Sequence, residues 1–211
     1  GQRKSFQKAC YNVDVLFQEN KDNDFTWKDF QARNDNELVA IYGNFINRIL
    51  VLTHKYYDGV VPTPNATETV DEETLSELST LPVQIAESIE KYRFREASQL
   101  LLKIARLGNK YLADEEPWKK QKIDPERVKT IMYVGLQIAA VLAIASTPFL
   151  PKTAVKLKRM LGLAEDSKWS DLDSAKHLPA GHEIQPPELL FEKIEDSIIE
   201  EQLNKLNPST E

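Results

Sequence analysis

The chain has 211 residues, of which 41% are apolar and 28% charged, and its formal net charge is -6. This composition argues against a disordered chain, and the length allows one domain of ordinary size, with or without an appendage. The single cysteine, Cys10, excludes an internal disulfide and a thiolate-rich zinc site, and no signal-peptide pattern is present, so we expect a reducing cytoplasm.

Apolar residues recur at helical spacing along most of the chain, and glycine is scarce, so we predict an all-α fold. The first predicted helix runs from about Trp27 to His54, after twenty residues with only a weak, mixed pattern. The polar side chains of Asn44 and Arg48 lie on one face of it, beside the buried stripe. That stripe is expected to contain Leu38, Ile41, Phe45, Ile49 and Leu52.

A loop and a helical hairpin are predicted next. The segment 58–65 holds one glycine and two prolines and is predicted to be a loop. Asp71 and Thr74 offer caps for a helix that runs to about Tyr92. A further amphipathic helix then begins near Phe94 and packs back on its predecessor.

Prolines mark the boundaries of the next elements. The hairpin's second helix ends before Pro117, which places Trp118 just past a helix end. Pro125 suits the first turn of another helix, whose residues are apolar nearly all round and which we expect at the centre of the bundle. The most membrane-like stretch, 134–150, is interrupted by polar residues and a proline, so it predicts a buried helix.

The last predicted elements close the bundle. Pro148 and Pro151 bracket a sharp turn, a short helix covers 153–161, and Gly162 is its C-terminal cap. A polar stretch with prolines follows. The residues 188–206 are predicted to form a final helix.

Catalytic motifs are absent from the sequence. It contains no glycine-rich phosphate loop, no Gly-x-Ser-x-Gly elbow and no His-Glu-x-x-His pair. His177 and His182 lie in a polar loop without a cysteine or a fixed carboxylate nearby, so we interpret them as surface histidines. The carboxylate pairs 72–73 and 115–116 are interpreted as solvated faces or helix-terminal charges.

Three residues could together read a single unpaired base. An amide at Asn44, a guanidinium at Arg48 and an indole at Trp118 can hydrogen-bond and stack a base. The alternative is a solvated pair, with a local salt link to Asp58, and an indole that plugs the end of the bundle. The net negative charge weighs against RNA binding. However, acidic residues crowd into 68–77 and 192–201, and a local basic patch can form from Arg48, His54, Lys55, Lys110, Lys119, Lys120 and Lys122.

Several strings of the chain, in the right order from about residue 21 to 204, resemble the anticodon-binding domain of the methionyl-tRNA synthetase family. The string 44–48 resembles its Asn-x-x-x-Arg helix, and 109–111 followed by 116–118 is similar to its Asn-x-Tyr and Pro-Trp segment. Single strings recur in related class I synthetases, but the combination of Asn44, Arg48 and Trp118 is specific to the methionine branch. The other similar strings are 25–27, 36–38, 145–151, 161–163 and 190–194.

The resemblance implies a helical bundle of the class I aminoacyl-tRNA synthetase anticodon-binding type, with a C-terminal return helix. It also implies that Asn44 and Arg48 contact the first anticodon base, cytosine, while Trp118 stacks against it. Cytosine offers a donor and two acceptors, so an amide with a guanidinium matches its edge, whereas uracil would leave donors facing donors. The expected contacts to the tRNA backbone are Lys55, Lys110, Lys119, Lys120 and Lys122.

The sequence lacks the His-Ile-Gly-His-type and Lys-Met-Ser-Lys-Ser-type signatures of the family's nucleotide-binding fold, and it lacks a zinc-binding insertion. We therefore expect a fragment that recognises the CAU anticodon of methionine tRNA and has no catalytic residue or metal site of its own. The parent ligase is expected to attach methionine to tRNA with ATP and Mg²⁺, and to hold any Zn²⁺ in its catalytic domain.

Three segments are predicted. Residues 1–24 are expected to be an atypical remnant of the connector to the catalytic domain, 25–165 the helical bundle, and 166–211 a polar loop, a C-terminal helix and the start of a linker. The expected partners are methionine tRNA, through its anticodon loop, and the catalytic domain of the same chain, without a membrane. The alternative function is a helical protein-interaction module that does not bind RNA.

Overall fold

The computed structural model describes residues 25–173 and 177–206, and nearly all regular structure in these ranges is helical. Apart from one isolated bridge between Val60 and Glu183, the described residues form no β-structure. The predicted all-α fold is therefore confirmed. The predicted segment 1–24 lies outside the described residues.

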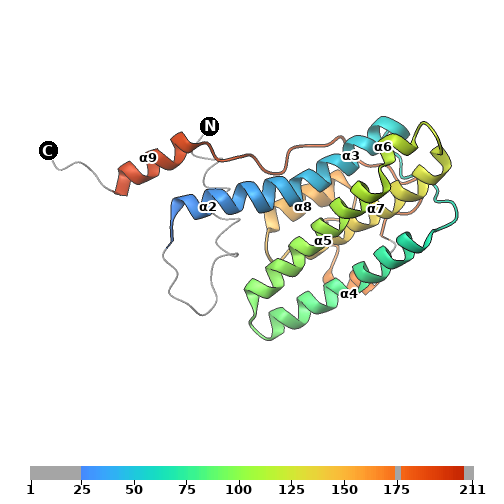
Figure 1. Ribbon diagram of the computed structural model, residues 1–211. Helices are drawn as coiled ribbons and strands as arrows, with labels where there is room; N and C mark the ends of the chain where they lie inside the picture. The colour runs from blue at the N-terminus through green and yellow to red at the C-terminus, as the bar shows by residue number, and fades with distance from the viewer. Residues whose placement is uncertain (1–24, 174–176, 207–211) are drawn as a thin grey trace.

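A long helical rod forms one side of the molecule (Figure 1). It consists of α2 (Trp27–Arg33), the π-helical segment η2 (Asn34–Gly43) and α3 (Asn44–Tyr57), which follow one another without a break. Asp58, in the left-handed conformation with φ 52°, ends the rod. The predicted helix is confirmed, but its π-helical middle was not predicted.

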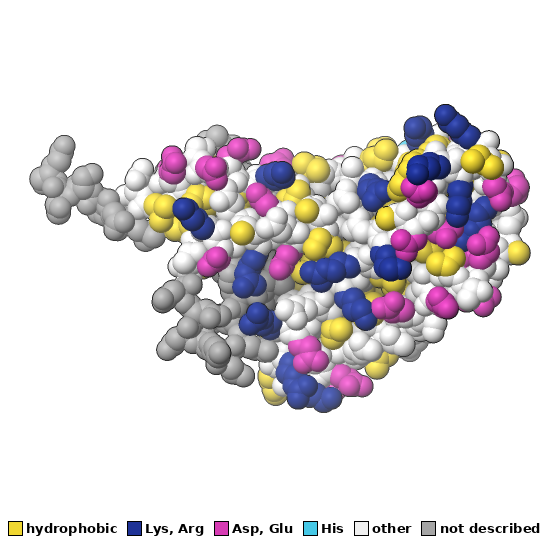
Figure 2. Space-filling view, in the orientation of Figure 1, with side chains coloured by type: hydrophobic (Ala, Val, Ile, Leu, Met, Phe, Trp, Pro, Cys, Tyr) yellow, Lys and Arg dark blue, Asp and Glu magenta, His cyan; other side chains and the backbone are white. Residues whose placement is uncertain are grey.

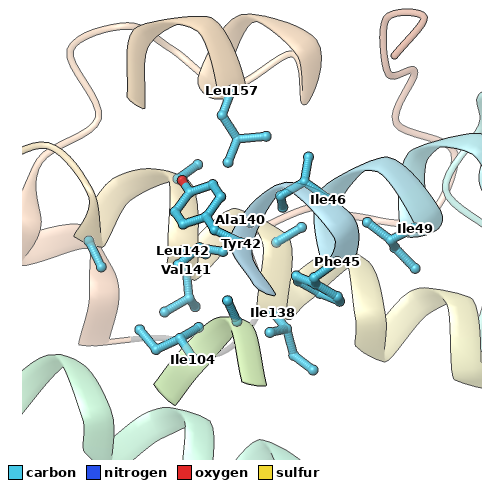
Figure 3. Packing of buried hydrophobic residues seen from close by; sticks show 14 of the residues in the cluster. Tyr42, Phe45, Ile46, Ile49, Ile104, Ile138, Ala140, Val141, Leu142 and Leu157 are labelled. Carbon is cyan, nitrogen blue, oxygen red and sulfur yellow. The ribbon is translucent and has the colours of Figure 1, made fainter. Parts of the chain in front are cut away.

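The π-helical segment changes which residues reach the core. Its i→i+5 hydrogen bonds widen the turn, so residues no longer follow the α-helical spacing. Tyr42 is fully buried and shares a 2.9 Å hydrogen bond with the Ser146 hydroxyl, whereas Ile41 is only partly buried. The expected places of Ile41 and Leu52 in the buried stripe were wrong, because both residues are only partly buried. Figure 3 shows Tyr42 packed among the core side chains near Phe45 and Ile46.

The helices α4 (Thr69–Glu90) and α5 (Phe94–Glu115) form an antiparallel hairpin beside the rod (Figure 1). Thr74 lies inside α4 and does not cap it, whereas Asp71, at the third position of the helix, takes part in a capping box with Glu68. Asp71 turns back and its Oδ2 accepts a 2.9 Å hydrogen bond from the backbone N–H of Glu68. This contact satisfies an amide that precedes the first turn.

The predicted central helix is α7 (Pro125–Ala145), which packs against α3, α4, α5 and α8. By length and composition it could cross a membrane, but 89% of its apolar window is buried inside the protein. Pro125 occupies its first turn, as predicted. Before it lies α6 (Pro117–Lys120), a single turn that carries Trp118. Trp118 therefore follows the end of α5, as the sequence predicted.

The bundle closes with α8 (Pro151–Met160) and a turn at Gly162. Gly162 has φ 66°, and its N–H donates to the Arg159 carbonyl at 3.1 Å, which confirms it as the helix cap. A short 3-10 helix, η3 (Trp169–Asp173), interrupts the polar loop that follows.

The predicted final helix was wrong in its first half, because only α9 (Asp196–Leu206) is helical. The preceding residues 185–195, which we call the strap, run extended along the rod (Figure 1). Side chains of the rod satisfy the strap's backbone: Asn34 Nδ2 donates to the Glu192 carbonyl at 3.0 Å, and Gln31 Nε2 donates to the Ile194 carbonyl at 2.7 Å. These long-range bonds replace the helical bonds that periodicity predicted.

Candidate nucleic-acid interface

The structure brings Arg48 and Trp118 into direct contact. Arg48 projects from α3 and Trp118 from α6, and the guanidinium carbon lies 4.7 Å from the centre of the indole ring. This distance is within the range of a cation–π interaction. The alternative salt link to Asp58 is not formed, since Arg48 makes no ion pair within residues 25–173 and 177–206. Both side chains are half-buried.

Asn44 lies one turn before Arg48 and is exposed. Its Nδ2 donates a 3.0 Å hydrogen bond to Asn109 Oδ1. Asn109 is itself fixed, because its Nδ2 donates to the backbone carbonyls of Ile41 at 2.8 Å and Ala105 at 3.1 Å. The hydrogen bond to Asn109 engages one N–H of the Asn44 amide and fixes the orientation of that amide group.

Close packing of α3 against α5 places Asn109 beside Asn44. A Cβ added at Gly108 would lie 2.3 Å from Phe45 Cε2, so only glycine allows the two helices to approach this closely. We did not predict Asn109 as a site residue. The sequence feature that could have identified Asn109 is the Asn-x-Tyr string at 109–111, which resembles the family's segment.

A buried ion cluster lies next to α6. The Arg127 guanidinium forms two hydrogen bonds with the Asp71 carboxylate and one, at 2.8 Å, with Glu115 Oε2. The Tyr111 hydroxyl donates to Asp71 Oδ1 at 2.5 Å, and Lys120 Nζ donates to Glu115 Oε2 at 2.7 Å. We call these five residues the Arg127 cluster. Of the two interpretations of Glu115, the helix-terminal charge is confirmed, since Glu115 ends α5, and the solvated face is wrong, because the residue is only 7% exposed.

Hydrogen bonding keeps Asp71 and Arg127 charged despite their burial. Burial acts to raise the pKa of Asp71, but hydrogen bonds from Arg127 and Tyr111 outweigh it and hold that pKa below its usual value. Burial, together with the hydrogen bond to Asp71, raises the pKa of Tyr111. Burial acts to lower the pKa of Arg127, but its bonds to Asp71 and Glu115 reverse this and raise it.

The predicted backbone-contacting lysines lie near this site in different states. Lys110 pairs with Asp114 and Lys119 with Glu116, each at 2.7 Å and exposed. Lys120 belongs to the Arg127 cluster. Exposed pairs of this kind contribute only about 0–1 kcal/mol, so a phosphate can exchange for the carboxylate.

Two further lysines complete this surface. Lys55 Nζ lies 5.6 Å from the centre of the Tyr56 ring, and Lys122 is exposed without an ion pair in the described part of the chain. Figure 2 shows lysine and arginine side chains on the face that carries α3, α5 and α6, interspersed with carboxylates. The net negative charge of the chain therefore does not exclude a local basic surface.

The two histidines of the polar loop are partly exposed. His182 Nε2 lies 2.8 Å from the Leu161 carbonyl, and the backbone N–H of His177 donates to Gln137 Oε1 at 2.7 Å. Among the residues that the structure describes, no group of three or more His, Cys, Asp or Glu side chains is arranged to hold a metal ion.

Comparison with protein families identifies the fold. A family model described as the anticodon binding domain of methionyl tRNA ligase matches residues 61–210. The chain belongs to this family. A second model, tRNA synthetases class I (M), matches residues 8–50 and so begins within the segment that we expected to be atypical. Asn44 and Arg48 lie in one matched region and Trp118 in the other, so the candidate site forms where the two regions meet.

Curated methionine–tRNA ligases are close in sequence. The chain is 61% identical over 189 residues to the one from Flavobacterium psychrophilum and 53% identical over 188 residues to one from Bacteroides fragilis. Each match covers 89% of this chain but only 28% of the relative. The chain therefore spans less than a third of the length of these ligases.

Solved structures share the fold. The free form of Mycobacterium tuberculosis methionyl-tRNA synthetase superposes with a TM-score of 0.82 at 21% sequence identity, over 89% of this chain and 39% of that one. The same enzyme in complex with methionyl-adenylate gives a TM-score of 0.81 over 87% of this chain and 37% of that one. This likeness confirms the predicted helical bundle of the synthetase anticodon-binding type.

Proposed function

We propose that this chain reads the anticodon of methionine tRNA for a methionine–tRNA ligase, and that Asn44, Arg48 and Trp118 hold the first anticodon base, cytosine. The observation that carries the proposal is the contact of Arg48 with Trp118, with Asn44 one turn away, in a chain of this family. The site therefore offers hydrogen-bonding groups and a stacking surface side by side, as recognition of an unpaired base requires.

The orientation of Asn44 supports a preference for cytosine. Because Asn109 binds one N–H of the Asn44 amide and so fixes which way that amide faces, Asn44 Oδ1 is available to accept from the amino group of cytosine. The guanidinium of Arg48 can donate to the ring nitrogen and the carbonyl of the same base. Uracil has a carbonyl in place of the amino group, so two acceptors would face each other and lose a hydrogen bond.

In this proposal, Trp118 contributes to the affinity for the base but does not discriminate between bases. Stacking of a base on an aromatic ring contributes about 1–3 kcal/mol. An exposed cation–π contact contributes only about 0.5–1 kcal/mol. A base can therefore displace the Arg48 guanidinium from the indole ring, which frees the donors of Arg48 for the edge of the base.

For the whole ligase we propose the reaction named for its relatives, attachment of methionine to tRNA in the cytoplasm, with ATP and Mg²⁺. No residue of this chain is assigned to that chemistry. We propose that ATP, Mg²⁺ and any Zn²⁺ bind in the class I catalytic region of the ligase, because the second matching family model is that of class I tRNA synthetases. This chain contributes recognition: it positions the tRNA so that the distant acceptor end can be charged.

The test is binding of the full chain to an RNA hairpin with the CAU anticodon, and to one in which that cytosine is uracil, over a series of salt concentrations. We expect tighter binding of the cytosine hairpin and a loss of this preference in Arg48→Ala. Arg95→Ala is the matched control, because Arg95 is an exposed arginine on α5, about 20 Å along the helix from Asn109.

Weak binding that ignores the base change, or a preference that persists in Arg48→Ala, would refute the proposal. It would favour the alternative of a helical protein-interaction module. The same comparison is then repeated in the full-length ligase.

A further inference from the structure

We propose that the Arg127 cluster is a positioning device for Trp118, which sets the place of the indole that stacks the anticodon base. This inference rests on the proposed function, because it concerns the residue that binds the base. The cluster joins the first turns of α4 and α7, through Asp71 and Arg127, to the end of α5, through Tyr111 and Glu115.

The short helix α6 cannot position itself. It has only four residues, and Pro117 is its one buried residue. An isolated turn of this length is not stable in water, because a single turn fixes several backbone angles for one hydrogen bond. The place of Trp118 relative to Arg48 therefore depends on what holds the two ends of α6.

The start of α6 is held through Glu115. Between Glu115 and Pro117, the residue Glu116 adopts the left-handed conformation, with φ 44° and ψ 57°. This conformation costs of order 1–3 kcal/mol for a residue with a side chain and persists only where the surroundings fix it. The bond from Arg127 Nη2 to Glu115, at 2.8 Å, fixes the residue on one side of this turn.

The end of α6 returns to the same cluster by two routes. Lys120 Nζ donates to Glu115 Oε2 at 2.7 Å, across α6 itself. The Lys120 carbonyl accepts from the Asp124 N–H at 2.7 Å, and Asp124 Oδ1 accepts from the backbone N–H of Arg127 at 3.0 Å. Both ends of α6 are thus tied to Arg127.

The buried carboxylates of Asp71 and Glu115 both bind the buried guanidinium of Arg127. At the rim of the cluster, Lys120 pairs with Glu115, and the exposed Glu68 lies 3.3 Å from Arg127 Nε. Removal of one buried charge would leave another uncompensated, which strongly destabilises a protein. The Tyr111 hydroxyl is the mildest part to remove, because Tyr111→Phe keeps the packed ring and every charge and loses one hydrogen bond.

The test compares Tyr111→Phe with Tyr133→Phe in the full chain. Tyr133 is a half-buried tyrosine of α7 outside the cluster, so its variant makes the same chemical change elsewhere. One readout is the indole N–H resonance of Trp118 in ¹⁵N-labelled protein, assigned with Trp118→Phe. The other is affinity for the CAU hairpin, measured with Trp118 present and in the Trp118→Ala background.

We expect Tyr111→Phe to shift the Trp118 resonance but not that of Trp169, and to weaken hairpin binding about three- to tenfold, the factor that loss of one hydrogen bond corresponds to. In the Trp118→Ala background the same substitution should have little further effect, because it acts through the indole. Tyr133→Phe should change neither readout.

Two results would overturn the inference. One is an unchanged Trp118 resonance in Tyr111→Phe. The other is an equal loss of affinity from Tyr111→Phe in the natural chain and in the Trp118→Ala background, because a purely structural role does not act through the indole.

If Tyr111→Phe does not fold, Lys120→Met replaces it. Its comparison is Lys119→Met, since Lys119 lies on the same helix but pairs with the exposed Glu116. Only the loss caused by Lys120→Met should depend on Trp118. If Trp118→Ala binds the CAU hairpin as tightly as the natural chain does, the proposed function is refuted. The Trp118 resonance in Tyr111→Phe would still show whether the cluster positions the indole.

Discussion

The guanidinium of Arg48 lies over the indole of Trp118, with the guanidinium carbon 4.7 Å from the ring centre. The two residues belong to helices that do not follow each other in the chain, α3 and the single turn α6. Their contact depends on the close approach of α3 and α5 at Gly108 and on the ties that hold α6. The proposed base-reading site is therefore a property of the assembled bundle.

Trp118→Ala should weaken binding of the cytosine and uracil hairpins by similar factors. Loss of a stacking surface worth about 1–3 kcal/mol corresponds to a factor of about 5 to 150 in affinity. Base identity is read by hydrogen bonds, so the ratio of the two affinities should change far less than either affinity. Fluorescence anisotropy with the two labelled hairpins measures both. A loss confined to the cytosine hairpin would contradict the assignment.

Asn109→Ala should reduce the preference for cytosine more than it reduces affinity. Without Asn109 Oδ1, the Asn44 amide can flip and donate an N–H to the carbonyl that uracil carries in place of the amino group of cytosine. Asn47→Ala is the control, because Asn47 is an exposed asparagine on the same helix as Asn44. The same pair of hairpins gives the ratio, and an unchanged ratio in Asn109→Ala would show that Asn109 does not orient Asn44.

Gly108→Ala should destabilise the protein, although alanine is the better helix former. Its Cβ would lie 2.3 Å from Phe45 Cε2, and overpacking of this kind costs about 1–3 kcal/mol. Urea denaturation measures the free energy of unfolding. The double variant with Phe45→Leu should recover part of the loss, because leucine vacates the space; equal destabilisation in both backgrounds would argue against this contact.

The stability that Asp71 contributes should disappear in acid. Its folded-state pKa lies below the unfolded value of about 3.9, so the contribution is complete above that value and is lost as the pH falls through the folded pKa. The difference in unfolding free energy between the natural chain and Asp71→Asn should therefore be constant near neutral pH and shrink below about pH 4. Chemical denaturation at several pH values tests this, and a difference that stays constant into strong acid would contradict it.

Local patterns predicted much of the fold. Apolar spacing identified the rod, the hairpin and the central helix α7, and Pro125 and Gly162 marked a helix start and a helix end because their effects on the backbone are local. The same patterns failed where contacts with residues distant in the sequence determine the backbone conformation. The strap has helical spacing in sequence, but amides of the rod, such as that of Asn34, bind its backbone and hold it extended.

By itself, the sequence determined the all-α fold, and it predicted Arg48 on a helix face and Trp118 just past a helix end as residues of the proposed base-reading site. Only the tertiary structure decided that these two side chains touch, that Asn109 sets the direction of the Asn44 amide, and that Glu115 is buried beneath α6 rather than solvated. The physical reason is that helix propensity and periodicity act over a few residues. In contrast, the close approach of α3 and α5 and the balance of charge around Arg127 arise only when four helices pack together.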